Sequence, residues 1–213
     1  MHSRAGIPSG GRNQPVPNTP TIIEEAASAM RGVAALVIGD RRAPQYFDFS
    51  QRGLVSSFIA FLAVTLLNGG RAMVLARAGP PGETFRAVAV VAVLFACQIG
   101  FCAIVLRQLK RFAGLVPYII ADNWATFTVT LGLTILTLFG FSGEIAILLV
   151  GILVIVIEIN IARLIVTLSP MQIAMFIVAQ FVGVALGLLL TGGLFPTPAE
   201  LDAIGAAASN QPA

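Results

Sequence analysis

The chain has 213 residues, of which 57% are hydrophobic and only 11% charged, with a formal net charge of +3 and a mean hydropathy of +0.90. Soluble domains carry roughly 25% charged residues, so this composition excludes an ordinary soluble domain and indicates a protein whose solvent is lipid. The arginines are scattered and form no basic face with aromatic support, which argues against a nucleic acid partner. The lipid bilayer is the expected partner.

Two segments precede the first long apolar run. Residues 1–19 are rich in Gly, Pro, Ser and Asn and predict a disordered tail. Residues 20–52 are expected to form an amphipathic cytoplasmic helix and a juxtamembrane linker, with the helix capped by Thr19, started by Pro20 and ended at Gly39. The expected apolar face consists of Ile22, Ala26, Met30, Val33 and Val37, and the polar face includes Glu24, Glu25, Ser28 and Arg31.

This N-terminal helix has two candidate roles. It lies against the cytoplasmic ends of the spans or on the lipid surface, or it docks a partner or a second copy of the chain. In the linker, Tyr46, Phe47 and Phe49 follow a pair of arginines, a composition typical of the membrane–water interface. We interpret them as an anchor, and we expect Asp48 or Ser50 to cap the next helix.

Five apolar runs are long enough to cross a bilayer, whose hydrocarbon core is about 30 Å thick. We expect them over residues 53–75, 85–106, 117–139, 144–168 and 171–190, in a transmembrane bundle that covers residues 53–193. Gly69 and Gly70 weaken the end of the first run and predict a bend or an early exit there. Residues 79–82 predict a tight turn, and residues 194–213 are expected to form a short external tail.

The basic residues set the expected orientation. Arginine and lysine are concentrated before the first run and between the second and third. Basic residues collect on the cytoplasmic side of membrane proteins. We therefore expect a cytoplasmic N-terminus and an external C-terminus.

Ionisable side chains inside the third and fourth runs are the main functional candidates. A charge at the centre of a membrane helix costs at least about 2.5 to 3.5 kcal/mol, so each needs a shielded partner. Asp122 and Arg163 are expected at the same depth on antiparallel neighbours, and we predict an ion pair between them, with Asn123 or Asn160 completing its hydrogen bonds. With Glu158, these residues form the candidate intramembrane polar cluster.

Glu158 lies deeper than the other members of this cluster and is five residues from Arg163, so the two do not share a helix face. Three roles stay open for its carboxyl group. It forms a structural hydrogen bond within the bundle, it couples a proton or an ion, or it contacts a span of another protein.

Small residues recur at every fourth position of the last run, at Ala179, Gly183 and Gly187. Such a helix-packing stripe permits close approach of another helix. Packing within the bundle is the default interpretation, and a homo-oligomer is the alternative. In the third run, Tyr118 and Trp124 are interpreted as a membrane-interface belt.

No motif indicates an enzyme. The sequence has no phosphate-binding loop, dinucleotide fingerprint, zinc-protease motif or nucleophile elbow. The single histidine, His2, lies in the expected tail, so serines such as Ser56 and Ser57 lack an activating base. Cys97 and Cys102 point to different faces of one helix, which suits neither a disulfide nor a shared metal. We expect no catalytic residue, no metal and no cofactor.

Four short motifs carry a resemblance: Tyr46-Phe47-Asp48, Ser57-Phe58, residues 118–124 (YIIADNW) and residues 158–163 (EINIAR). In these, over roughly residues 44–190, the chain resembles a group of uncharacterised bacterial inner-membrane proteins. The resemblance implies an inner-membrane location and no activity. The layout of five spans after a cytoplasmic segment is also similar, in architecture alone, to Yip-type membrane-trafficking proteins.

The sequence therefore predicts an all-α membrane protein, a bundle of five transmembrane helices with an N-terminal amphipathic cytoplasmic helix. Because its polar groups are few and resemble structural ones, the leading interpretation is a non-enzymatic protein that organises or assists other membrane components. The alternative is a small transporter or channel subunit in which Glu158, Asp122 and Arg163 line a polar path. A water-accessible cavity that reaches Glu158 would favour transport, and a closed bundle would favour the organising role.

Overall fold

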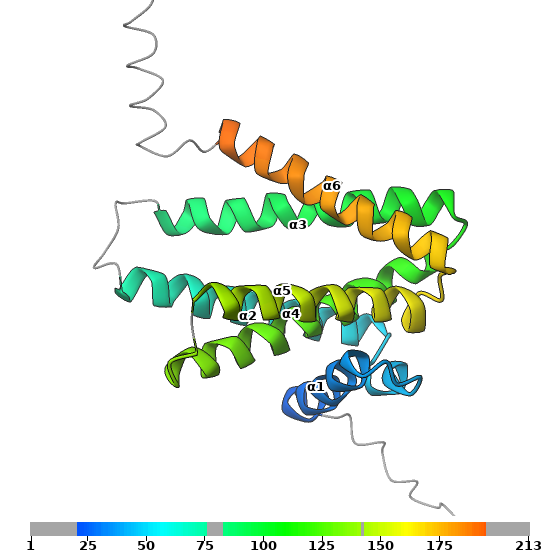
Figure 1. Ribbon diagram of the computed structural model, residues 1–213, viewed down its shortest axis with the longest axis horizontal. Coiled ribbons are helices and arrows are strands. Elements are labelled where there is room, and N and C mark those ends of the chain that lie inside the picture. The colour runs from blue at the N-terminus through cyan, green and yellow to red at the C-terminus, as the bar shows by residue number, and fades with distance from the viewer. Residues whose placement is uncertain (1–20, 76–82, 142, 195–213) are drawn as a thin grey trace, which may run out of the picture.

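The computed structural model describes residues 21–75, 83–141 and 143–194, and these residues form helices and turns without any strand (Figure 1). The predicted N-terminal tail, the turn over 79–82 and residues 195–213 of the predicted external tail lie outside the described residues. The helices are α1 (Ile22–Val37), α2 (Gln51–Leu75), α3 (Glu83–Gln108), α4 (Leu115–Leu138), α5 (Glu144–Asn160) and α6 (Pro170–Leu194), with short turns at η1 (Ala43–Tyr46), η2 (Phe112–Gly114) and η3 (Ile161–Ile165).

Four of the described helical segments are long and apolar enough to cross a membrane, as an integral membrane protein requires. They are Phe85–Gln108, Phe112–Leu138, Glu144–Ile165 and Pro170–Leu194. Over its apolar part Gln51–Leu67, α2 is shorter than these four. The early exit predicted at Gly69 and Gly70 does not occur, because α2 continues as a helix to Leu75.

The helices form two layers (Figure 1). One layer is the pair α3 and α6, which pack against each other extensively. The other layer is α2, α4 and α5, with α2 packed along α4 and with α1 lying against α4 and α5. Contacts between the two layers are few. This arrangement leaves room for a cleft where the layers face each other.

The stripe of small residues on α6 is turned toward α3. A Cβ atom at Gly183 would lie 2.9 Å from the carbonyl oxygen of Cys97, and one at Gly187 would lie 2.9 Å from Cδ2 of Leu94. Ala179 is buried on the same helix. The stripe therefore lets two backbones of one chain approach closely.

The N-terminal helix begins two residues later than predicted. Its cap is Thr21, not Thr19: the Thr21 hydroxyl accepts from the Glu24 amide at 3.3 Å, and the Glu24 carboxylate accepts from the Thr21 amide at 2.7 Å. This capping box satisfies two amides at once. The predicted end is confirmed, since Gly39 follows the last turn with a φ of +70°.

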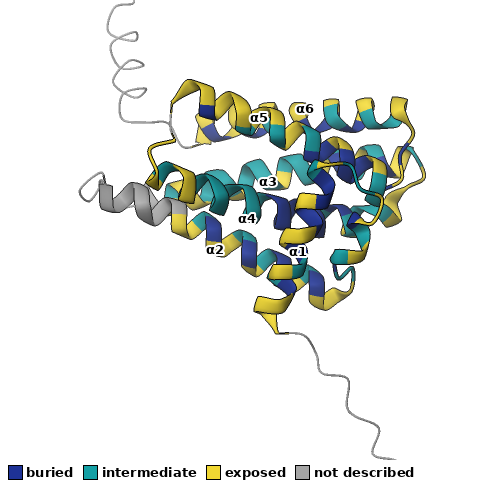
Figure 2. Cartoon of the chain, turned by 60° about the horizontal axis from the view of Figure 1, so that its bottom comes forward, coloured by how far each residue is buried: buried dark blue, intermediate teal, exposed yellow. Residues whose placement is uncertain are grey.

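The buried face of α1 agrees with the predicted one only in part (Figure 2): Val33 is buried and Ala26 and Val37 pack against the core, as predicted. Ile22 and Met30 are exposed, whereas Glu25 is buried. The Ser56 hydroxyl donates to the Glu25 carboxylate, and the Ser28 hydroxyl donates to the carbonyl of Tyr46 at 2.8 Å. Small residues decided this face, because they admit the neighbouring chain more closely than Ile or Met would. They include Ala29, Gly32 and Ala35.

The predicted aromatic belt on α4 is wrong. Tyr118 and Trp124 are 0% and 1% exposed. The Tyr118 ring meets Phe176 edge to face with centroids 4.9 Å apart, and Trp124 meets Phe127 in the same way at 5.7 Å. Phe47 of the linker is likewise buried, under Gly32. These rings bury their large apolar area in helix contacts.

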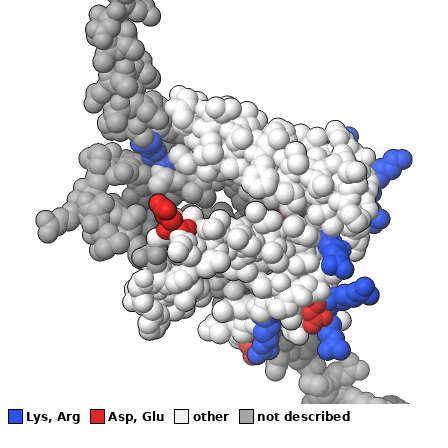
Figure 3. Space-filling model, viewed as in Figure 1, with Lys and Arg blue, Asp and Glu red and all other residues white. Residues whose placement is uncertain are grey.

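Charged groups collect at one end of the molecule. Figure 3 shows most of the lysine and arginine side chains at the end where α1 and the α3–α4 and α5–α6 connections lie. The face in view between the two ends is almost free of charge. Large apolar side chains are exposed along all four long apolar segments. Such a surface suits acyl chains and would be a liability in water.

We predict that Gly183→Ala destabilises the pairing of α3 and α6. The added methyl group must displace backbone atoms of α3, and overpacking of this kind costs about 1 to 3 kcal/mol. The measurement is thermal unfolding of the purified protein in detergent. The matched control is Gly192→Ala on the same helix, where a Cβ atom meets nothing within 4 Å. An equal Tm for the two variants would contradict this packing.

Candidate functional site

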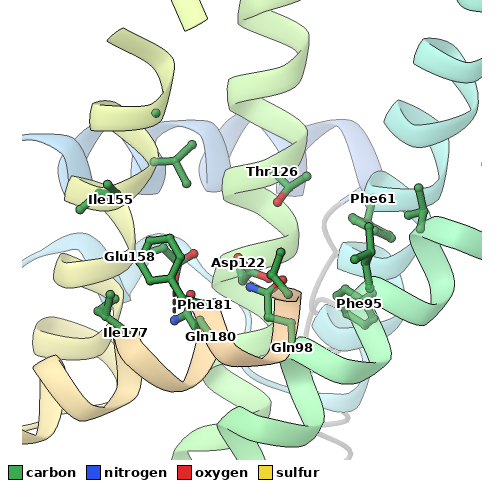
Figure 4. A pocket seen from close by; sticks show the side chains of 15 residues that line it. Phe61, Phe95, Gln98, Asp122, Thr126, Ile155, Glu158, Ile177, Gln180 and Phe181 are labelled. Carbon is green, nitrogen blue, oxygen red and sulfur yellow. Dashed lines mark hydrogen bonds between the residues drawn. The ribbon is translucent and has the colours of Figure 1, made fainter. Parts of the chain in front are cut away.

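Four polar side chains, one from each long apolar helix, meet where the two layers face each other (Figure 4). Gln98 comes from α3, Asp122 from α4, Glu158 from α5 and Gln180 from α6. Asp122 and Glu158 thus belong to the layer of α2, α4 and α5, and the two glutamines belong to the layer of α3 and α6.

Asp122 and Glu158 form a carboxyl pair. They are 9% and 8% exposed, and their carboxyl groups lie within hydrogen-bonding reach of each other. An ionised carboxylate only accepts hydrogen bonds, so one group can donate to the other only while one of them holds a proton. The pair is therefore suited to hold a single positive charge, either a proton or a cation, between two oxygens.

The glutamines and Tyr118 tie the carboxyl pair to the opposite layer. Gln180 Nε2 donates to Glu158 Oε2 at 3.0 Å, and Gln98 Nε2 donates weakly to the Tyr118 hydroxyl at 3.5 Å. The Tyr118 side chain is also within hydrogen-bonding reach of Glu158 and of Cys102. Both glutamine contacts join one layer to the other. A change in the protonation or the ligand of Glu158 would therefore affect the contact between the two layers.

The carboxyl pair borders a cavity of about 570 Å³, which we call the cleft. Its other walls are almost entirely apolar and include three phenylalanines, Phe61, Phe95 and Phe181. Phe181 is 61% exposed, so the cleft is not sealed from its surroundings. A hollow is visible between the layers in Figure 3. The site is an apolar cleft with one polar patch, which consists of the two carboxyl groups and the two glutamine amides.

The backbone changes character directly after Glu158. The sequence predicts one continuous helix over residues 144–168, but α5 ends at Asn160 and a π-helical turn covers Ile161–Ile165. The amide of Val166 donates to the carbonyl of Ile161 at 3.1 Å, five residues earlier. Single π-turns inside helices occur frequently at functional sites. This one begins within one turn of the carboxyl pair.

The structure divides the predicted polar cluster into separate contacts. Asn123 Nδ2 donates to the Ser57 hydroxyl on α2 at 3.1 Å, and its Oδ1 is buried without a partner among the described residues. Asn160 Nδ2 donates to the carbonyl of Leu36 on α1 at 2.8 Å. These two asparagines therefore join helices within one layer and at its charged end, away from the cleft.

The predicted ion pair between Asp122 and Arg163 is not formed. Arg163 is exposed while Asp122 is buried, and the described residues include no ion pair between them. Arg163 lies in the π-turn at the end of its span, where a long side chain can reach water at much lower cost than it could enter the bundle. The predicted partner of Asp122 is replaced by Glu158.

From the sequence, neither Gln98 nor Gln180 is identified as a site residue, and Tyr118 is interpreted as part of a membrane-interface belt. Gln98 is the amide side chain in the interior of the apolar run of α3, whereas Gln108 ends the helix beside Arg107, and polar residues inside a span are functional candidates by default. The sequence therefore contains a signal for Gln98. It contains no signal that the four side chains converge, because their convergence depends on which helices become neighbours.

No family model, no curated protein and no solved structure matches this chain. Among the described residues, no group of three or more His, Cys, Asp and Glu side chains could hold a metal ion. The chemistry on which a function can be argued is therefore that of the cleft: a carboxyl pair, two amides, a phenol and apolar walls.

We predict that Asn160→Ala loosens α1 from the bundle. The Leu36 carbonyl keeps its hydrogen bond from the Gly39 amide, so the variant loses the single side-chain hydrogen bond that joins α5 to α1. Such a bond contributes about 0.5 to 1.5 kcal/mol, equivalent to roughly a 2- to 13-fold larger open population. Trypsin cleavage at Arg31 and Arg41 measures it, with Ile159→Ala as the outward-facing control. Equal cleavage rates in the two variants would show that this hydrogen bond does not hold α1.

Proposed function

We propose that this protein is a small, non-enzymatic membrane transporter whose substrate occupies the cleft and whose coupling group is the carboxyl pair. The observation that carries the proposal is that a cavity of about 570 Å³ reaches both Asp122 and Glu158. The organising role expected from the sequence rested on a closed bundle with structural polar groups. An open cleft that reaches Glu158 favours transport.

The two carboxyl groups are difficult to explain as structural groups. Each is expensive inside a membrane, and when both are ionised they repel each other at close range. A single glutamine in place of Glu158 could hydrogen-bond Gln180 equally well without either cost. A site that alternates between a proton and a substrate needs the carboxyl chemistry that a purely structural site can do without.

A contact between Glu158 and a span of another protein is less well supported. Glu158 is 8% exposed and lies at the cleft wall beside Gln180 (Figure 4). A partner helix would have to enter the cleft to reach it. A small molecule has no such restriction.

We place the chain in the bacterial inner membrane with five spans, an internal N-terminus and an external C-terminus. At about 1.5 Å per residue, the 25 residues of α2 measure roughly 37 Å, longer than the hydrocarbon core of about 30 Å. The basic end of the molecule supports the orientation. In this arrangement α1 is the amphipathic helix that covers the cytoplasmic ends of α4 and α5.

The layer contacts supply a mechanism. Gln180 bonds to the Glu158 carboxylate across the layers, so a proton or substrate that occupies the carboxyl pair competes with that contact. Weakening it lets the α3–α6 pair move relative to α2, α4 and α5, because few other contacts join the layers. Movement of one packed unit against another is the common basis of alternating access.

We predict that a lipophilic carbodiimide labels Glu158 or Asp122 in native membranes. The reagent adds to a protonated carboxyl group, so labelling should fall as the pH rises and should disappear in the double variant with Glu158→Gln and Asp122→Asn. Peptide mass spectrometry locates the label. The internal control is Glu25, a buried carboxylate outside the cleft that pairs with Ser56.

An absence of label at both carboxyl groups would show that the carboxyl pair is sealed and would overturn the proposed coupling role. Labelling of Glu25 at the same rate would also overturn it, because the cleft would then confer no particular access. The single variants Glu158→Gln and Asp122→Asn are expected to keep the Tm of the wild type within a few degrees, since each replaces a carboxyl group by an amide of the same shape.

A further inference from the structure

The ionisable groups that line the cleft indicate the charge of its ligand. We infer that its substrate is a lipophilic monovalent organic cation, an ammonium or phosphonium compound, whose positive centre lies at the carboxyl pair and whose apolar body lies against the phenylalanines. The inference rests on the proposed function and names its substrate class. Asp122 and Glu158 give the cleft wall two carboxyl groups, and no lysine, arginine or histidine is among the described residues that line it.

Asp122 has unused capacity to accept a donor. It is nine-tenths buried, lines the cleft, and has Glu158 as its side-chain neighbour. Among the described residues no amide, hydroxyl or ammonium group of the protein donates to its carboxyl group, whereas Glu158 receives Gln180. A buried carboxyl oxygen without a donor is costly. A bound cation would remove that cost.

Aromatic rings lie on both sides of the carboxyl pair. Figure 4 shows Phe61 and Phe95 on one side of Asp122 and Phe181 near Glu158 on the other. The centroids of Phe61 and Phe95 are 5.1 Å apart with the rings tilted by 35°. Ring faces attract organic cations, most strongly where water is excluded. Carboxyl groups and phenyl rings together are the usual receptor for an ammonium group.

The volume of the cleft and its apolar walls define the rest of the ligand. A cavity of about 570 Å³ falls in the range that holds a drug-sized ligand. Val154, Ile155 and Phe181 line the cleft and are partly exposed on the lipid-facing part of α5 and α6. A ligand soluble in the bilayer can therefore enter sideways, and its apolar body finds apolar walls.

Other substrate classes fit less well. An anion would meet two carboxyl groups and no cation among the described lining residues. A neutral lipophile would leave Asp122 without a donor. An inorganic cation could use the carboxyl and amide oxygens, but it would leave the apolar walls with their phenylalanines unused.

The test is saturable binding of radiolabelled tetraphenylphosphonium to the full-length protein in lipid nanodiscs. We expect binding that Asp122→Asn and Glu158→Gln weaken by about tenfold or more, as the loss of a desolvated charge partner does. Triphenylphosphine oxide and tetraphenylborate, similar in shape but neutral and anionic, should not compete. Competition by either one at a similar concentration would overturn the assignment of a cation.

Gly151 is a position from which a larger side chain can fill the cleft. It lines the cleft, and a Cβ atom there meets nothing within 4 Å. Gly151→Phe should abolish binding, whereas the control Gly100→Phe, at a glycine that also meets nothing within 4 Å but does not line the cleft, should bind like the wild type. Unchanged binding by Gly151→Phe would place the ligand elsewhere.

A third variant covers the case in which Gly151→Phe does not fold. Phe61→Leu keeps an apolar wall and removes a ring, so we expect a several-fold weaker affinity for the phosphonium ion with an unchanged Tm. An unchanged affinity would count against the aromatic part of the site. Carbodiimide labelling without phosphonium binding would refute the substrate class and leave the proposed transport role standing, whereas loss of both would refute the two together.

Discussion

Two carboxyl groups buried side by side impose the main constraint on this protein. In a medium of low dielectric constant an uncompensated charge is expensive, so Asp122 and Glu158 require donors from other helices. Gln180 supplies one to Glu158, and Gln98 reaches the same region through Tyr118. These polar contacts join the two layers, α3 with α6 and α2 with α4 and α5. The apolar surfaces of the layers line the cleft beside the contacts.

An open apolar cleft is tolerable here for a physical reason. In water, apolar walls would close on each other, but in a bilayer the lipid chains are as apolar as leucine and no such driving force exists. Helices then associate where shape or hydrogen bonds favour it. Gly183 and Gly187 provide the shape between α6 and α3, since α3 packs so closely that a Cβ atom at either glycine would lie 2.9 Å from an atom of α3. The layers have no comparable seam between them.

The charged end is fixed by a different set of contacts. Asn160 binds the end of α1, Asn123 binds Ser57 on α2, and Ser56 binds Glu25 on α1. These hydrogen bonds join α1, α2, α4 and α5 into one unit without involving the cleft. Polar residues inside the membrane therefore do two kinds of work in this chain: the asparagines and serines fasten one layer, and the carboxyl pair with its glutamines forms the site between layers.

The sequence by itself determined the lipid solvent, the ends of the four long apolar segments to within about five residues, the stop at Gly39 and the identity of both carboxyl groups in the site. Those features are local, since they follow from composition, run length and backbone preference along one segment. Only the tertiary structure decided that Asp122 meets Glu158 and not Arg163, that Tyr118 and Trp124 are buried, and that Gln98 and Gln180 reach the site. A helix in lipid is apolar on every side, so its sequence carries little record of which face meets which neighbour. A polar side chain then acquires its partner from the packing of whole helices.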